Sequence, residues 1–525
     1  MSRLVLAAFV VLVSVAPAGA QTAERYWIVV GTDGGAEVAP TERALARRAL
    51  RASAEAPTRP DRDVNPAALA ALRAAGVVPV HTSRWLGAVS ADLTPEQAAA
   101  VGALPDVREV RRTARLVSQG AASLAPYAEA RPLVFIDYGP SAAQMRFVRA
   151  DEAVAAGRTG VGVLFGVLDT LFDFDHPVLR HIPTSGRLVG QRNLIGGTQT
   201  NYHGLATSSI ALGNRDGVLV GPAHGARVLA GTTEFAPTET HAEEDAFVAG
   251  LEWMEREGVD VVSVSLGYST FDAPQASYRY QDMNGNTAIV TRAADMAVAL
   301  GVVVVVSAGN EGASAWRYIT APADGDDVIT VGAATSGRTR ASFSSVGPTF
   351  DGRTKPDVAA LGVSVYVAAR GGGAEFGNGT SYSAPMVAGV AAQMLGARPS
   401  LTPAQVRDAL RRTASRAATP DNELGWGVID AVAALAVATA SEGTPGGASA
   451  WSLAPSVARS GQVLTLTTGA AEPVSVDVLD VLGRRVATWT LTGSAQARVV
   501  VPPLRPGVYF ARVPGAPALR FTVVR

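Results

Sequence analysis

The chain has 525 residues, of which 48% are hydrophobic and 17% charged, so it can build large folded cores and is not globally disordered. At roughly 100–200 residues per domain, this length predicts several domains. The 45 basic and 46 acidic residues give a formal net charge of −1, without the basic excess typical of nucleic-acid binders. The absence of cysteine excludes disulfides, thiolate metal sites and cysteine nucleophiles.

The first twenty residues have the organisation of a secretory signal peptide. Arg3 forms a short positive region, residues 4–15 are apolar, and small residues at 18–20 are typical of a cleavage site. A membrane anchor is the alternative, but a membrane span needs about twenty apolar residues. We therefore expect residues 1–20 to direct the protein to secretion.

Residues 24–116 are predicted to form a small α+β unit. The expected strands and helices are a strand at 25–30, a helix from Pro66 to Gly76, strands at 77–83 and 86–93, a helix opened by Thr94, and a strand at 107–110. The order β-α-β-β-α-β is the ferredoxin-like, split-βαβ pattern. Residues 41–54, rich in Ala and Arg, are predicted to add an exposed helix. Residues 112–132 lack periodicity and are predicted to be a linker.

Residues 138–440 are predicted to form a doubly wound α/β domain with a parallel sheet. Continuous apolar runs alternate with helix-like stretches, as expected for strands covered on both faces. The apolar runs are 161–168, 259–266, 302–306 and 328–333, and the helix-like stretches are 243–257, 287–300, 383–395 and 402–412.

The end of the chain has a different pattern. Residues 441–450 are rich in Gly and Ser and are predicted to be a linker. Six short strand-like pieces follow within residues 451–525, separated by turn residues. This spacing predicts a C-terminal all-β sandwich.

Two polar residues of the middle domain stand where α/β sheets build their sites. Asp169 ends the apolar run at 161–168, at the carboxyl edge of a predicted strand. His203 precedes Gly204 at the start of a predicted helix, where it can serve as a general base. A turn-capping aspartate and a surface histidine are the alternatives, and neither residue alone decides between them.

Two further residues add a nucleophile and an oxyanion donor. Ser381 lies among glycines before a helix of small residues, in which Pro385 is expected in the first turn, where its missing N–H costs no bond. Asn310 follows the strand at 302–306 and can donate its amide to an oxyanion. A serine N-cap and an asparagine in a turn are the alternatives. Together, the order Asp…His…Ser matches one known arrangement of the acyl-transfer triad.

The middle domain resembles the subtilisin-like (subtilase, peptidase S8) serine proteases, of the Bacteroidetes type. The motifs that carry the resemblance are GVLDT at 166–170, HG at 203–204, SLG at 265–267, SAGNEG at 307–312, FSSVGP at 343–348, KPDV at 355–358 and GNGTSYSAPMVAG at 377–389. DYGPSAAQMRFVRADEAVAAG at 137–157 is similar to the entry segment of such enzymes.

The resemblance implies an endopeptidase that acts through an acyl-enzyme. It implies that Asp169 orients His203, that His203 accepts the proton of Ser381, and that the Asn310 amide with the Ser381 N–H holds the oxyanion. It further implies that Ser265, Leu266 and Gly267 bind an extended peptide substrate as an added strand. No cofactor is required for this chemistry.

Two positions depart from the family pattern. Leu171 replaces the usual Gly two residues after Asp169, and Leu205 replaces the usual Thr two residues after His203. Leu171 is expected to change the turn beside Asp169, and Leu205 removes a hydroxyl next to the base. The alternative function is therefore a catalytically weak or inactive subtilase-fold protein that binds surfaces.

The flanking units also resemble known modules. Residues 24–116 resemble the subtilase propeptide, an intramolecular chaperone and inhibitor, and VDVLDVLGRRV at 476–486 with LRPGVYFARV at 504–513 resembles the type IX secretion sorting domain. A generic accessory sandwich is the alternative for the tail. The expected partners are peptide or protein substrates, the chain's own propeptide and the type IX machinery, for a monomer outside the cell or on its surface.

Other chemistries fit less well. Lys355, the single lysine, can be imagined as the base of a serine hydrolase, but it belongs to KPDV, a structural motif in subtilases. An α/β-hydrolase needs G-x-S-x-G and the order Ser…Asp…His, and the chain has neither. The acidic stretch at 324–327 suggests structural calcium, but its spacing matches no recognised loop, so no metal ligand is assigned.

Overall fold

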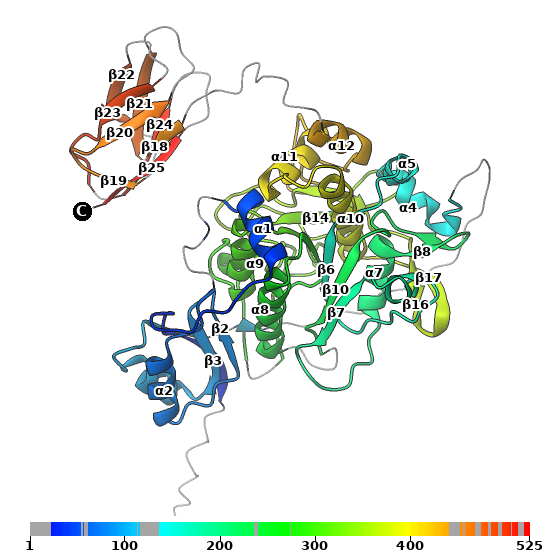
Figure 1. Ribbon diagram of the computed structural model, residues 1–525, viewed down its shortest axis with the longest axis horizontal. Helices are drawn as coiled ribbons and strands as arrows, with labels where there is room; N and C mark the ends of the chain where they lie inside the picture. The colour runs from blue at the N-terminus through cyan, green and yellow to red at the C-terminus, as the bar shows by residue number, and fades with distance from the viewer. Residues whose placement is uncertain are drawn as a thin grey trace, which may run out of the picture. The chain divides into compact units, whose positions relative to one another are not determined.

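The computed structural model consists of two compact units, Met1–Thr439 and Ala440–Arg525 (Figure 1). The described residues are 23–53, 56, 61–112, 114–115, 136–235, 240–272, 275–439, 452–454, 457–467, 474–480, 485–491, 496–505, 507–512 and 519–524. The expected signal peptide, the Gly/Ser-rich linker at 441–450 and most of the linker at 112–132 lie outside these residues.

The chain begins with a four-stranded antiparallel sheet in the order β2-β3-β1-β4, as the split-βαβ prediction requires. Its elements are β1 (Glu24–Val29), α2 (Pro66–Ala74), β2 (His81–Ser83), β3 (Ala88–Leu93), α3 (Pro95–Gly102) and β4 (Glu109–Arg112). Side chains of the sheet and the two helices, among them Ile28, Leu72 and Val89, form a separate hydrophobic core. Asn65 caps α2, and Thr94 opens α3 as predicted, in a capping box with Gln97.

The predicted extra helix exists as α1 (Glu42–Arg51), between β1 and α2. The prediction that it is exposed is wrong, because Arg47 is 3% and Arg51 5% exposed. Both guanidinium groups pair with carboxylates of the following domain, which sequence periodicity within the helix does not reveal.

A seven-stranded sheet in the order β15-β14-β13-β11-β6-β10-β7 forms the centre of the next domain, and all its pairs are parallel. The strands are β6 (Leu164–Asp169), β7 (Leu188–Asn193), β10 (Arg227–Thr232), β11 (Val261–Val264), β13 (Val303–Ser307), β14 (Ile329–Ala334) and β15 (Val358–Leu361). The predicted doubly wound class is confirmed. The sequence does not predict three of the strands, β7, β10 and β15, because their apolar runs are short or interrupted.

Helices cover both faces of this sheet (Figure 1). One face carries α7 (His203–Leu212) and α10 (Thr380–Ala397), and the other carries α8 (His241–Arg256) and α9 (Ile289–Ala299). Phe165 and Val167 point into the first core, whereas Leu164 and Leu168 point into the second. Burial on both faces explains why the strands are continuous apolar runs.

Shorter elements complete the first unit. They are β5 (Ala114–Arg115), α4 (Ala142–Phe147), α5 (Ala150–Ala155), α6 (His181–Thr184), β8 (Asn214–Arg215), β9 (Leu219–Val220), β12 (Ala276–Ser277), β16 (Val365–Ala369), β17 (Gly373–Gly377), α11 (Pro403–Thr413), α12 (Ala431–Thr439) and three 3-10 turns at Gly139–Ser141, Tyr280–Asp282 and Arg370–Gly372. Within the described chain, no helix has the length and apolarity to cross a membrane.

The second unit contains two β-sheets, in agreement with the all-β prediction. One has the order β18-β20-β23 and the other β19-β25-β24-β21-β22, and all pairs are antiparallel except β19 with β25. The strands are β18 (Ser452–Ala454), β19 (Val457–Arg459), β20 (Val463–Thr467), β21 (Val474–Asp480), β22 (Arg485–Leu491), β23 (Gln496–Val500), β24 (Gly507–Arg512) and β25 (Leu519–Val524). Both sheets contribute to one core, which includes Leu464, Val478 and Phe521.

Candidate active site

Asp169 is the last residue of β6, and its side chain is completely buried. Oδ1 accepts the Thr170 N–H at 2.7 Å and lies 2.7 Å from His203 Nδ1, while Oδ2 accepts the Thr207 hydroxyl at 2.9 Å. Because a carboxylate only accepts hydrogen bonds, Nδ1 of His203 is the donor. Both oxygens of Asp169 are thus held, and the imidazole is oriented with Nε2 left to act as a base.

His203 opens α7, as the sequence predicted for a residue before Gly204. Its backbone N–H donates to Asn201 Oδ1 at 2.9 Å, and the next N–H donates to Thr170 Oγ1 at 2.9 Å, so side chains take up donors that a helix start leaves free. The imidazole side chain is 26% exposed. Burial lowers the pKa of His203, but the charge and hydrogen bond of Asp169 outweigh it, so this pKa is raised above its ordinary value.

Ser381 is the second residue of α10, and its hydroxyl donates to the Ser265 carbonyl at 3.3 Å. Among the described residues, no hydrogen bond joins Ser381 to His203. Hydrogen bonds between nucleophile and base are often long in the free enzyme and tighten with substrate.

Pro385 lies beyond the first turn of α10, so the prediction that it costs no helical bond is wrong. The N–H of residue 385 would ordinarily bond the carbonyl of Ser381, and proline has none. Ser265 Oγ donates to that carbonyl at 2.9 Å instead. A residue that directly follows β11 therefore satisfies a carbonyl in the first turn of α10.

Asn310, which follows β13, has its amide orientation fixed by Thr380. Asn310 Oδ1 accepts the Thr380 N–H and the Thr380 hydroxyl, each at 2.9 Å, so Nδ2 points elsewhere. The position of a Cβ built on Gly379 lies 3.7 Å from Asn310 Nδ2 and 3.7 Å from the Ser381 nitrogen. Asn310 Nδ2 and the Ser381 nitrogen therefore lie near one point beside Ser381, as the two donors of an oxyanion hole must.

Ser265, Leu266 and Gly267 directly follow β11 and lie beside Ser381. The Leu266 carbonyl accepts from Ser307 Oγ at 3.4 Å, whereas in the described chain the Gly267 N–H and carbonyl have no hydrogen-bond partner. A side chain at Gly267 would sit 2.2 Å from Thr320 Oγ1. Gly267 thus keeps its backbone hydrogen-bonding groups unpaired within the described chain, at a position where a Cβ would clash with Thr320.

The two departures from the family pattern leave the loop next to the histidine well bonded. The Leu171 N–H donates to the Asn201 carbonyl at 3.1 Å, and the Leu171 carbonyl accepts the Leu205 N–H at 3.0 Å. The hydroxyl near the base comes from Thr207, one turn into α7, and bonds Asp169 directly. Sequence reasoning missed Thr207, although its place four residues after His203 on one helix face was the available signal.

Lys355 is buried, and its ammonium group donates hydrogen bonds to three acceptors. Its Nζ donates to the Val328 carbonyl at 3.1 Å, to Thr330 Oγ1 at 3.0 Å and to Asp357 Oδ2 at 2.9 Å. Burial alone would raise the pKa of Asp357, but Lys355 and Arg411 lower it to about 2. An ammonium with three acceptors beside a carboxylate is a structural group and not a base.

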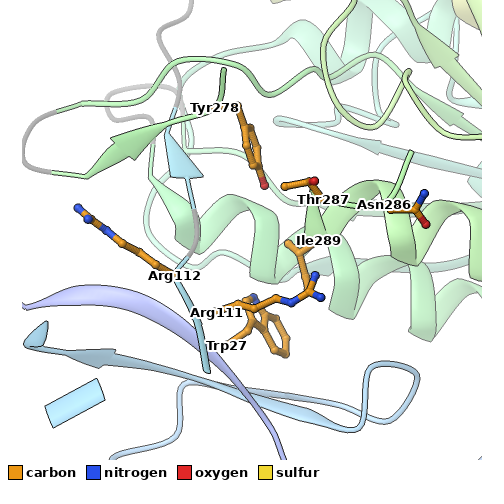
Figure 2. A pocket seen from close by; sticks show the side chains of 7 residues that line it. All are labelled: Trp27, Arg111, Arg112, Tyr278, Asn286, Thr287 and Ile289. Atoms are coloured by element: carbon orange, nitrogen blue, oxygen red, sulfur yellow. The ribbon is translucent and has the colours of Figure 1, made fainter. Parts of the chain in front are cut away.

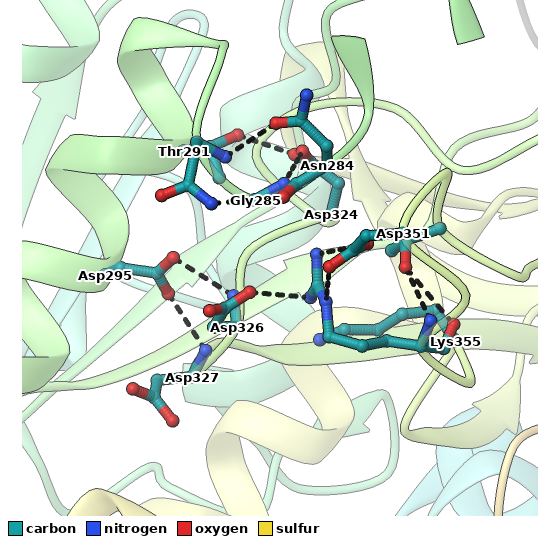
Figure 3. A network of polar contacts seen from close by, with 12 residues as sticks. Asn284, Gly285, Thr291, Asp295, Asp324, Asp326, Asp327, Asp351 and Lys355 are labelled. Carbon is teal, nitrogen blue, oxygen red and sulfur yellow. Dashed lines mark hydrogen bonds and ion pairs between the residues drawn. The ribbon is translucent and has the colours of Figure 1, made fainter. Parts of the chain in front are cut away.

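The acidic stretch at 324–327 also has protein partners (Figure 3). Asp324 accepts the Thr291 hydroxyl at 2.6 Å and the Gly285 N–H at 2.9 Å. Asp326 pairs with Arg353, and Asp327 pairs with Arg407. No group of three or more metal-ligating side chains occurs in the described part of the chain.

Comparisons with known proteins identify the families that two parts of the chain match. Residues 160–427 match the model of the subtilase family (peptidase S8), and residues 37–125 match that of the Bacteroidota peptidase S8 propeptide domain. The chain is 36% identical to Subtilisin DY of Bacillus licheniformis over 275 residues, which are 51% of this chain and 89% of that protein.

Other relatives are covered less completely. Subtilisin NAT of Bacillus subtilis subsp. natto is 34% identical over 269 residues, 51% of this chain and 64% of the relative. Serine protease AprX of Bacillus subtilis is 31% identical over 322 residues, 54% of this chain and 68% of the relative. The residues that match the subtilase family model, 160–427, contain the seven strands of the parallel sheet.

Proposed function

The chain belongs to the subtilase family of serine endopeptidases, and we propose that it hydrolyses peptide bonds through Asp169, His203 and Ser381 by way of an acyl-enzyme. The observation that carries the proposal is the Asp169–His203 pair, with 2.7 Å between Oδ1 and Nδ1. Ser381 stands nearby at the start of α10, with two N–H groups flanking the space beside it.

In the proposed mechanism, Ser381 first turns away from the Ser265 carbonyl. His203 Nε2 takes the proton of the Ser381 hydroxyl as Oγ bonds to the substrate carbonyl carbon. The Asn310 amide and the Ser381 N–H then stabilise the oxyanion. His203 gives the proton to the leaving amine as the peptide bond breaks, and water attacks the acyl-enzyme by the same route.

The positive end of the α10 dipole lies at Ser381, which favours the negative charge that develops there. The Asp169 carboxylate stabilises the imidazolium that forms on His203. An extended substrate pairs with the open backbone of Gly267 as an added strand. Each proposed residue thus has a role in the mechanism that its position supports.

We propose that residues 24–116 form a propeptide that inhibits the enzyme and is removed by a cut within residues 112–140. The match of residues 37–125 to the propeptide model supports this. The two parts also share a hydrophobic cluster, in which Trp27 and Trp85 pack with side chains of α8 and α9, including Phe247 and Val290. The bounds proposed for the catalytic domain are residues 138–440.

We further propose that the enzyme is secreted, acts as a monomer and reaches the cell surface through the type IX machinery. The signal-like residues 1–20 and the tail motifs at 476–486 and 504–513 support this part of the proposal. The substrates are proteins or peptides of unassigned sequence. Residues 451–525 would be the sorting domain.

The test of the catalytic assignment is Ser381→Ala in the full chain. Peptide hydrolysis and covalent labelling by a fluorophosphonate should both disappear, while the fold is unchanged. Ser383→Ala is a matched control, because Ser383 lies two residues further along α10 and its hydroxyl donates to the Ala360 carbonyl at 3.3 Å. Near-normal turnover without Ser381 would overturn the proposal. A correctly folded wild-type enzyme that neither labels nor hydrolyses would favour the surface-binding alternative.

A further inference from the structure

Helix α1 of the N-terminal domain presents a row of arginines to the end of α8. Arg47 donates from Nη1 to the Glu255 carbonyl at 3.1 Å and to the Val259 carbonyl at 2.8 Å, and its Nη2 pairs with the Glu255 carboxylate. Arg48 adds a bond from Nη2 to Glu255 Oε2 at 2.7 Å. Because the Glu255 side chain has no exposed surface, these are buried, charge-assisted bonds.

Arg43 and Arg51, on the same helix, share a second carboxylate. Arg51 Nη1 donates to Asp260 Oδ1 at 3.0 Å, and Arg43 pairs with Asp260 Oδ2. Arg43 Nε also reaches the Gly258 carbonyl at 3.1 Å, and Arg51 Nε reaches the Pro399 carbonyl at 2.7 Å. The spacing of four residues between Arg43 and Arg47, and again between Arg47 and Arg51, places all three on one helix face.

The arginines meet the end of α8, where a helix leaves carbonyl groups unsatisfied and carries partial negative charge. The backbone N–H and hydroxyl of Thr41, just before α1, each donate to the Arg256 carbonyl at 3.0 Å. Together with Arg47 on the Glu255 carbonyl, the N-terminal domain thus caps the last turn of α8. We call Glu255, Asp260 and the carbonyls of Arg256, Gly258 and Val259 the α1 dock.

The α1 dock lies at the amino ends of β6 and β11, whereas the candidate active site lies at the carboxyl ends of these strands. Asp260 Oδ2 accepts the N–H of Leu164 at 2.8 Å, at the beginning of β6, and Asp260 immediately precedes β11. Asp169 ends β6, and Ser265 follows β11, so the catalytic groups stand at the other ends of these strands. A ligand in the α1 dock therefore leaves the substrate strand free.

The N-terminal sheet also contacts α8 directly, through Arg25 and Ser90 on Asp245 and through Ser83 on Glu252. Near β4, a cavity of about 460 Å³ lies between Trp27, Arg111 and Arg112 on one side and Tyr278, Asn286, Thr287 and Ile289 on the other (Figure 2). Around α1, by contrast, guanidinium groups occupy carboxylates and backbone carbonyls directly. The N-terminal domain is thus attached to the catalytic domain at α1 by specific polar contacts.

We propose that the α1 dock is a guanidinium-binding site of the catalytic domain, which holds the propeptide through α1 independently of the active-site cleft. Because these contacts lie outside the linker, they should slow release of the N-terminal domain after the linker is cut. The vacated dock presents two carboxylates and a helix C-terminus, a combination that fits another arginine-rich helix. The names propeptide and protease rest on the proposed function. The attachment of α1 to the dock does not depend on it.

The test uses the full chain with Ser381→Ala, so that no self-cleavage occurs, and with a site for a sequence-specific protease inserted between residues 116 and 135. After cutting, the dissociation rate of the N-terminal fragment is measured by surface plasmon resonance. Adding Arg47→Ala and Arg51→Ala should speed dissociation by about 30-fold or more, because buried charge pairs act mainly on the off-rate. Arg73→Ala with Leu50→Ala is the control, since both side chains are exposed.

Either of two outcomes overturns the proposal: immediate loss of the unaltered fragment on cutting, or equal off-rates for the arginine variant and the control. Asp260→Asn tests the same attachment from the catalytic side and should also speed dissociation. If the arginine variant fails to fold, hydrogen exchange of the α1 amides is measured instead, in the Ser381→Ala chain that keeps its α1 arginines, before and after the linker is cut. An undocked helix of 10 residues frays, so α1 amides should be protected only when docked. None of these readouts requires activity, so failure of the proposed catalytic function is seen separately.

Discussion

Ser265 and Ser381 are joined by two reciprocal hydrogen bonds. Ser265 Oγ donates to the Ser381 carbonyl at 2.9 Å, and Ser381 Oγ donates to the Ser265 carbonyl at 3.3 Å. The first bond replaces the helical one that Pro385 cannot make, and the second holds the hydroxyl of the candidate nucleophile. The end of β11 and the start of α10 are thereby tied together at the reacting atom.

Ser265→Ala should therefore lower kcat by about tenfold with little effect on KM, because a buried carbonyl left unsatisfied costs on the order of 1–3 kcal/mol. Substrate contacts of this segment use backbone groups, which the substitution keeps. Ser263→Ala, two residues earlier in β11, is a matched control, since its buried hydroxyl has no partner among the described residues. Steady-state kinetics on one peptide checks this, and an unchanged kcat in Ser265→Ala would show that the bond does not position Ser381.

The pH dependence of kcat/KM should have an acidic limb above the ordinary histidine pKa of about 6.5. The pKa of His203 is raised, since Asp169 outweighs burial, and only neutral imidazole accepts a proton. Activity is therefore lost as the pH falls through this raised pKa. The pH profile with an unchanged peptide substrate measures the limb directly.

Asp169→Asn should move that limb to lower pH, because burial then acts on His203 without an opposing charge. It should also lower kcat by about 10⁴-fold, since the amide favours the wrong imidazole tautomer. An acidic limb at the same pH in Asp169→Asn would mean that another group controls the profile.

The sequence predicted the parallel sheet and the candidate site because their signals are local. β6 and β13 are apolar runs that end at or shortly before Asp169 and Asn310, so strand ends and polar residues could be placed together. The burial of Arg47 was not predictable, because its partner Glu255 is distant in sequence. The same holds for the bond between Ser265 and the Ser381 carbonyl, which depends on two segments meeting in the fold.

Thr207→Val should lower kcat/KM by about tenfold, because it removes a hydroxyl that bonds the buried Asp169 carboxylate, a charge-assisted bond of roughly 1.5–3 kcal/mol. Valine keeps the shape and burial of threonine, so the loss reports the hydrogen bond. Thr207→Ser keeps the hydroxyl and should retain most activity. If both variants behaved like wild type, Thr207 would not support Asp169, and the departure at Leu205 would stand uncompensated.

Removal of the C-terminal unit should leave peptide hydrolysis intact. All the proposed catalytic residues precede residue 390, and the core of the second unit is built from side chains between Ala458 and Val523. A chain that ends at Thr439 should hydrolyse a short peptide with a kcat/KM within about twofold of the full chain, since few contacts are expected to cross a domain boundary.

In its native host, the same truncation should leave the enzyme in the periplasm if residues 451–525 are a sorting domain. Lost activity of the purified truncation would mean that the tail supports the catalytic domain. Normal delivery to the surface without the tail would instead make it an accessory sandwich, because export would then need only the signals that remain.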